Sequence, residues 1–308
     1  MKTIDVANGP KSAPRIILGC MRIPALSTED AARIISTAYG MGINHFDHAT
    51  CYGDGEAEKR FGDALPLTGI NREHIIIQSK CGLHFDRREF DWSRDDIIKS
   101  TEQSLSRLKT DYLDVLLLHR PDLLFDPEEV AEAFDKLHSE GKVKYFGVSN
   151  VTPGQIELLK KYVKQPIVFN QLQFSLDQTQ LIDAPMYLNN LTTDRSIDRD
   201  NGVLDYCRLN DITVQAWSPL QIGMFKGCFV DHPDYPELNQ MLDKIGHKYG
   251  ISKTAVAIAW ILRHPAKMQA IAGTMNPDHL KEICDACRIE ISHQEWYELY
   301  LASGKFLP

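Results

Sequence analysis

The sequence predicts an α/β fold, a (β/α)8 TIM barrel with an N-terminal β-hairpin. Three observations lead to this prediction: strand-like runs alternate with helical patterns along most of the 308 residues, these runs are almost continuously apolar, and the alternation repeats over about 250 residues. Alternation implies parallel strands joined by helices, and continuous apolarity implies that both faces of the sheet are covered.

The chain can be assigned element by element from its N-terminus. Residues 8–10 read Asn-Gly-Pro between two β-favouring runs, which predicts the hairpin. Ser27 precedes two acidic residues and then apolar positions at helical spacing, which predicts a helix over residues 28–39. The predicted barrel strands cover residues 15–19, 43–46, 75–80, 113–119, 143–150, 167–171, 212–217 and 269–273. The later predicted helices cover residues 56–65, 94–108, 127–139, 153–162, 203–209, 238–249, 254–263 and 277–286.

A doubly wound open sheet is the alternative fold. It requires a Gly-x-Gly-x-x-Gly phosphate loop after an early strand, and residues 19–22 read Gly-Cys-Met-Arg instead. Two segments, 174–200 and 221–236, are longer than ordinary loops, and in a barrel they would lie over the C-terminal mouth. No repeat or linker marks a boundary, so residues 1–308 are expected to form a single domain.

Composition narrows the function classes. Lys and Arg total 34 against 42 Asp and Glu, a formal charge of −8, and no long basic run is present, so nucleic acid is not an expected partner. No stretch reaches the roughly 18 apolar residues that cross a bilayer, and the first residues resemble no signal peptide, so a cytoplasmic protein without membrane association is expected. The seven scattered cysteines fit reduced thiols, and Cys284 and Cys287 fit plain helix positions rather than a metal site.

Four proton-handling side chains follow successive predicted strands. Asp47 and Tyr52 come after the second strand, Lys80 ends the third and His119 ends the fourth. The C-terminal ends of barrel strands meet at one mouth, so these residues are expected to converge. An ammonium group favours ionisation of a nearby phenol, and a carboxylate can hold that ammonium in place. Singly, each residue could be a solvated lysine, a turn cap or a structural histidine; together they favour a catalytic site.

Ordered motifs occupy residues 47–53, 79–80, 116–119, 147–150, 170–171 and 216–220. Together they resemble the aldo/keto reductase superfamily, most closely its bacterial YdhF-type branch, and the resemblance runs from Gly19 to about Glu282. The resemblance implies carbonyl reduction with Tyr52 as the general acid. It also implies that Lys80 and Asp47 tune this acid and that His119 orients the carbonyl.

The same resemblance implies NADPH as cofactor, bound without a Rossmann domain, and does not exclude NADH. Met275 stands where many relatives carry a basic residue for the 2′-phosphate, although Lys281 is near in sequence. Trp217 would stack on the nicotinamide, unless it is a core residue. The other implied cofactor residues are Ser149, Asn150 and Gln171 at the carboxamide, Ser218, Pro219, Leu220 and Gly223 at the pyrophosphate, Gly19, Met21 and Arg22 beside the ribose, and Gly273, Thr274, Asn276 and Glu282 in the last segment.

Three functions therefore compete: an NAD(P)H-dependent reductase of small carbonyl compounds, an NADPH-binding regulatory module with little turnover, and a barrel glycosidase. The glycosidase needs two facing carboxylates, and only Asp47 is identified. Specificity is expected from residues 84–92, 121–126 and 174–200, where Phe85, Phe90 and Trp92 form either a pocket wall or loop packing. His48 is either a second imidazole near the acid or an imidazole turned toward the surface or a neighbouring strand. The natural substrate and the oligomeric state are left open.

Overall fold

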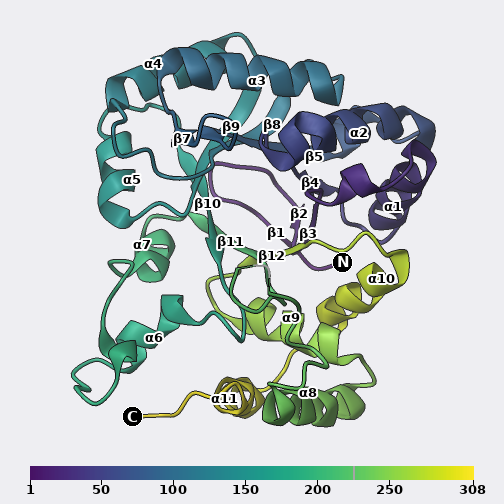
Figure 1. Cartoon of the computed structure of the whole chain (residues 1–308), viewed down its shortest axis with the longest axis vertical. Coiled ribbons are helices and arrows are strands. Elements are labelled where there is room, and N and C mark those ends of the chain that lie inside the picture. Colours follow the sequence, from purple (N-terminus) through teal and green to yellow (C-terminus); the bar gives the residue numbers. More distant parts are fainter. Residues whose placement is uncertain (225) are drawn as a thin grey trace.

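A closed parallel barrel forms the centre of the protein. The computed structural model describes residues 1–224 and 226–308. Within these residues eight parallel strands close into a barrel whose order follows the chain, which confirms the predicted fold (Figure 1). The barrel strands are β3 (Ile16–Gly19), β4 (His45–Asp47), β5 (Ile76–Cys81), β8 (Leu113–Leu118), β9 (Val143–Ser149), β10 (Ile167–Gln173), β11 (Thr213–Trp217) and β12 (Gln269–Ala272).

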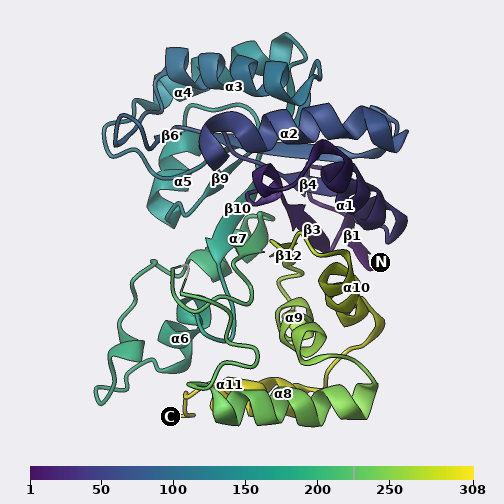
Figure 2. The same cartoon turned by 45° about the vertical axis from the view of Figure 1, so that its right-hand side comes forward.

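Helices surround this barrel. Both views show α3 and α4 side by side at one end of the molecule, and α8 beside α11 at the opposite end, near the C-terminus (Figures 1 and 2). The helices are α1 (Thr28–Gly40), α2 (Glu56–Ala64), α3 (Arg94–Leu108), α4 (Pro127–Ser139), α5 (Pro153–Lys160), α6 (Gln180–Met186), α7 (Val203–Leu209), α8 (Pro236–Tyr249), α9 (Lys253–Arg263), α10 (Pro277–Asp285) and α11 (His293–Ala302).

Side-chain caps set where several helices begin. The Ser27 hydroxyl accepts from the Asp30 amide, and Ser93 accepts in the same way at the start of α3. Ser292 and Glu295 form a reciprocal capping box at the start of α11. Such caps satisfy amides that have no partner within the helix, each contributing about 1 kcal/mol. They fix the lengths of the connections between strands and helices, and so the positions of the strand ends.

The predicted N-terminal hairpin is present and closes the end of the barrel at which the strands begin. It consists of β1 (Thr3–Ile4) and β2 (Ala13–Pro14), which pair antiparallel. Val6 and Ala13 are fully buried, and they cluster with Val115 and Leu117 of β8. An apolar plug at this end excludes water there, so a site can open only at the opposite end, where the strands terminate.

The structure adds elements that the sequence patterns did not predict. Helix α6 lies within the expected polar segment 174–200, and its internal Pro185 hides the helical pattern. Helix α11 lies beyond the last predicted element and buries Trp296, Leu299 and Tyr300. The second barrel strand includes Asp47, so the aspartate is held by the sheet itself rather than by a following loop.

The aromatic loop at residues 84–92 is partly a second small hairpin. Strands β6 (Leu83–His84) and β7 (Glu89–Phe90) pair antiparallel within it. Trp92 is fully buried against Phe125, with ring centroids 5.1 Å apart, whereas Phe85 and Phe90 are exposed. Trp92 therefore packs in the core, as one of the two alternatives anticipated, and only the two phenylalanines remain available at the surface.

Two further observations concern the described part of the chain. No helix in residues 1–224 and 226–308 combines the length and apolarity that crossing a membrane requires. Over the same ranges, no group of three or more His, Cys, Asp or Glu side chains is arranged to hold a metal ion. The seven cysteines are free thiols; Cys284 lies in α10 and Cys287 in the turn that follows it.

Candidate active site

The four residues predicted for catalysis meet at the C-terminal end of three neighbouring strands. Asp47 is the last residue of β4, Lys80 lies near the end of β5, and His119 directly follows β8. Tyr52 begins a 3-10 turn five residues beyond Asp47. Main-chain hydrogen bonds, including the Thr50 amide to the Lys80 carbonyl at 2.9 Å, hold the turn against the neighbouring strand. Sheet register therefore sets the relative positions of the four side chains.

Lys80 is the centre of the cluster. Its ammonium nitrogen lies 2.7 Å from Asp47 Oδ2, 2.8 Å from the His48 carbonyl oxygen and 3.1 Å from Tyr52 Oη. The side chains of Lys80 and Asp47 are 0% and 3% exposed. An ammonium group has three protons, and here each has an acceptor. Because Lys80 donates to the phenol oxygen, the phenol's own proton is free to point toward another acceptor.

Burial and charge act in opposite directions on these groups. Burial raises the pKa of Tyr52 to about 12, although Lys80 acts to lower it. Burial alone would lower the pKa of Lys80, but Asp47 and Tyr52 outweigh that effect and raise it. Lys80 favours ionisation of Tyr52, as expected from the sequence, but desolvation raises the pKa of Tyr52 by more than Lys80 lowers it. Tyr52 therefore keeps its proton and Lys80 keeps its charge at neutral pH.

His119 stands beside the phenol as a neutral imidazole. The rings of His119 and Tyr52 are nearly perpendicular, with centroids 5.8 Å apart. Burial, Lys80 and Arg120 together hold the pKa of His119 well below its ordinary value. A neutral imidazole carries one proton, on either Nδ1 or Nε2. A hydrogen bond at one nitrogen therefore determines whether the other nitrogen is a donor or an acceptor.

Cys51 contacts one of these nitrogens and was not anticipated. Its sulfur lies 3.5 Å from His119 Nδ1, and burial raises the pKa of the thiol to about 11, so the thiol is protonated at neutral pH. The only signal in the sequence was its position directly before Tyr52. His48, by contrast, is fully buried with its ring edge-on to Phe61 of α2 at 4.6 Å, so it is not turned toward the surface but packs against a helix.

A network of amide side chains inside the barrel supports Asp47 from below. Gln78 and Gln171 donate to Asp47 Oδ1 at 2.6 and 3.0 Å, and both also donate to Gln215 Oε1 at 2.9 and 3.1 Å. Gln215 in turn donates to Gln269 Oε1 at 3.1 Å. Gln171 was predicted at a cofactor carboxamide; its amide nitrogen faces Asp47 and Gln215, and that prediction now concerns its side-chain oxygen. The sequence analysis did not identify Gln78, Gln215 and Gln269 as part of the site. The signal that could have found them is a glutamine within an otherwise apolar strand.

Several residues predicted for cofactor binding lie together on β9, β10 and β11. Ser149 Oγ donates to the Gln171 carbonyl at 3.0 Å, and Asn150 Nδ2 donates to Ser149 Oγ at 2.8 Å. The Trp217 indole donates to Asn150 Oδ1 at 3.1 Å. Asn150 has a positive φ of 61°, a conformation that asparagine tolerates better than most residues and that turns its side chain out of the strand direction. The structure thus gathers an aromatic ring, a side-chain amide and a hydroxyl in one place.

The loop after β11 is tied down by a carboxylate from the preceding long segment. The Gly223 amide donates to Asp177 Oδ2 at 2.9 Å, and Tyr235 donates to Asp177 Oδ1 at 2.5 Å. Pro219 has no amide proton. Gly223 therefore uses its amide within the protein, and Ser218 and Leu220 remain as the predicted loop residues with amides for an anion.

The first and last cofactor segments approach each other across β3 and β12. Gly19 ends β3 beside Asp47, and Met21 is half-buried in the turn that follows it. Arg22 extends toward the end of β12, where its guanidinium donates to the Gly273 carbonyl at 3.1 Å. An exposed cation thus stands at the end of β12.

The remaining predicted residues surround the start of α10. Thr274 and Asn276 accept amide protons and cap this helix. Glu282 is half-buried in α10, and Met275 packs against the core. Lys281 forms an exposed ion pair with Asp278 at 2.9 Å. An exposed pair of this kind contributes less than about 1 kcal/mol, so Lys281 can change partner readily.

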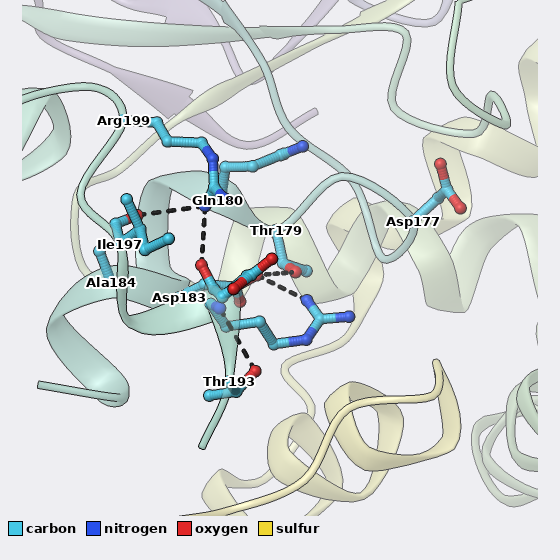
Figure 3. A pocket seen from close by; sticks show the side chains of 10 residues that line it. Asp177, Thr179, Gln180, Asp183, Ala184, Thr193, Ile197 and Arg199 are labelled. Atoms are coloured by element: carbon cyan, nitrogen blue, oxygen red, sulfur yellow. Dashed lines mark hydrogen bonds and ion pairs between the residues drawn. The ribbon is translucent and has the colours of Figure 1, made fainter. Parts of the chain in front are cut away.

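A separate pocket of about 390 Å³ lies in the segment that contains α6 (Figure 3). Asp183 lies in its wall and accepts from Thr179 at 3.0 Å and Arg195 at 2.8 Å, while its other oxygen accepts from Tyr300. Its lining residues, all between 177 and 199, do not include the four residues described above. Because both oxygens of Asp183 accept hydrogen bonds from other side chains, we interpret the pocket as part of the packing of this segment.

Comparison with known proteins identifies relatives over nearly the whole chain. The model of the aldo/keto reductase family matches residues 15–300. A 6-dehydroglucose reductase of Agrobacterium fabrum is 36% identical over 304 residues, covering 94% of this chain and 95% of its own. Oxidoreductase YdhF of Escherichia coli is 33% identical and covers 98% of both chains. An aldo/keto reductase of Klebsiella pneumoniae, solved with NADP and acetate, is 25% identical with a TM-score of 0.75, covering 97% of this chain and 94% of its own.

Proposed function

The chain belongs to the aldo/keto reductase family, and from that premise we propose that it reduces aldehydes or ketones to alcohols with Tyr52 as proton donor. The observation that supports this proposal best is the buried chain of hydrogen bonds from Asp47 through Lys80 to Tyr52. It ends on a protonated phenol at the mouth of the barrel, where a carbonyl oxygen can accept the proton.

Each residue of the cluster has a distinct task in this reaction. The carbonyl carbon gains a hydride and its oxygen gains the Tyr52 proton, so the product is a neutral alcohol. Lys80 stabilises the phenolate that remains, and Asp47 holds Lys80 in position. His119, neutral at physiological pH, donates a hydrogen bond from Nε2 to the carbonyl oxygen and so orients it.

We propose a nicotinamide cofactor, NADPH, as the hydride source. When bound, it supplies the hydride that the carbonyl carbon accepts. The residues present suit such a molecule: Trp217 offers an aromatic face, and Ser149 and Asn150 offer a hydroxyl and an amide group of the kind that a carboxamide requires. The amide nitrogen of Gln171 is used by Asp47 and Gln215, so Gln171 would offer its side-chain oxygen as an acceptor. The solved Klebsiella relative contains NADP, which supports the assignment.

We propose that the preference for NADPH over NADH rests on two cations, Arg22 at the end of β12 and Lys281 in α10. Arg22 lies at Gly273, and Lys281 is held only by an exposed ion pair. We expect Lys281→Gln to raise the KM for NADPH several-fold and to leave the KM for NADH unchanged. Equal effects on both cofactors would remove Lys281 from the 2′-phosphate site.

The test of the proposed function is NADPH consumption with a panel of aldehydes, ketones, dicarbonyls and sugar aldehydes. Sugar aldehydes are included because a relative 36% identical is a 6-dehydroglucose reductase. We expect turnover of at least one class, with small carbonyl compounds as the only partners required. Tight NADPH binding with negligible turnover across the panel would instead favour a regulatory, cofactor-binding protein.

A further inference from the structure

Arg120 stands apart from the other partly buried cations of this protein. Its guanidinium lies over the Trp217 ring at 5.6 Å, and its charge contributes to the low pKa of the neighbouring His119. Burial lowers the pKa of Arg120 itself, and the ionised form of Tyr52 acts to raise it. Arg120 therefore lies over Trp217 and directly follows His119, the residue proposed to orient the carbonyl.

Comparable arginines elsewhere in the described residues all have acceptors. Arg72 pairs with Asp114 at 2.8 Å, and Arg107 pairs with Glu58 at 3.0 Å. Arg15 donates to two main-chain carbonyl groups. Within the described part of the chain, Arg120 has no such ion pair and no carboxylate that raises its pKa. A partly desolvated charge without a partner costs free energy, and a charged group perturbed in this way beside a candidate active site is a candidate for binding a ligand.

We propose that Arg120 binds a carboxylate on the substrate, so that the preferred substrates are carbonyl compounds that carry an acid group. This inference rests on the proposed carbonyl reduction and narrows its substrate class. A planar guanidinium matches the two oxygens of a carboxylate with two parallel hydrogen bonds. Such a pair would hold the carbonyl oxygen between Tyr52 and His119 and would discriminate against neutral substrates of the same size.

The experiment compares succinic semialdehyde with its methyl ester, which differ in charge but share the aldehyde. We expect the wild-type protein to prefer the acid by at least about tenfold in kcat/KM. Arg120→Gln is expected to lower kcat/KM for the acid about 100-fold and for the ester less than about threefold. Arg120→Lys, which keeps the charge but loses the planar fork, should fall between them. Arg33→Gln on the exposed surface of α1 removes the same charge and should leave both values unchanged.

Three results would overturn this inference. The first is an equal loss for acid and ester in Arg120→Gln, and the second is a weaker Kd for NADPH in that variant, which would make Arg120 a cofactor residue. The third is a wild-type protein that reduces the ester as well as the acid; carbonyl reduction would then stand and only the acid preference would fail. A protein that reduces neither compound nor any member of the wider panel contradicts the proposed function itself.

Discussion

Lys80 and Asp47 form an ion pair of 2.7 Å that is almost completely buried at the end of two adjacent strands. Replacing Lys80 by Met leaves the carboxylate buried without its partner, so we expect a loss of about 3–5 kcal/mol in the free energy of unfolding. The double variant Lys80→Met/Asp47→Asn should lose less than the sum of the single variants, because it leaves no isolated charge. Urea denaturation measures this coupling, and strict additivity would argue against it.

Cys51 is expected to control the tautomer of His119. With the protonated thiol donating to Nδ1, the imidazole proton lies on Nε2, toward the substrate. Cys51→Val should lower kcat about tenfold and change the tautomer ratio, while Cys51→Ser, which keeps a donor, should restore both. Nitrogen chemical shifts of a ¹⁵N-histidine-labelled protein report the tautomer directly. An unchanged ratio in Cys51→Val would show that the thiol has no such role.

His48 should make the protein less stable in acid. Burial lowers the pKa of His48 to about 3, against 6.5 for an ordinary histidine, so between these values the unfolded chain binds a proton that the folded protein does not. Stability therefore falls as the pH drops below 6.5, by about 1.4 kcal/mol per pH unit for this group. In His48→Leu the slope of unfolding free energy between pH 6 and pH 4 should decrease by that amount. His45, also buried, remains in both proteins.

The control for that experiment is His279→Leu, at an exposed position of α10. This variant also removes one histidine, but an exposed one, so it controls for the loss of a histidine as such. The same slope in His48→Leu and in His279→Leu would show that the acid sensitivity arises elsewhere.

Gln215 links the amide network that supports Asp47. Gln215→Met removes the acceptor that Gln78 and Gln171 share, and leaves one buried amide proton of each without a partner. We expect a loss of about 2 kcal/mol in unfolding free energy. Activity should also fall, because the two amides that hold Asp47 lose their own support. Gln294→Met, at an exposed pair with Glu298, should change neither quantity.

The residues that could be predicted are those placed by strand order alone. Asp47 and Lys80 lie at the ends of strands whose apolar pattern is plain, and His119 directly follows such a strand. A parallel barrel brings these positions to one end whatever the details of packing. The supporting residues could not be predicted in this way. Whether Gln215 points inward depends on sheet register, and whether Cys51 reaches His119 depends on the turn at Tyr52. The strength of burial at Tyr52 likewise emerges only when the helices and loops are in place.

The most direct test of the proposed mechanism is the turnover of Tyr52→Phe. This change removes the proton donor and leaves the aromatic ring, so NADPH should bind with an unchanged Kd while kcat for carbonyl reduction falls by at least about 100-fold. Equal turnover by Tyr52→Phe and the wild-type protein, on a substrate that the wild-type protein reduces, would contradict the assignment of Tyr52 as the acid.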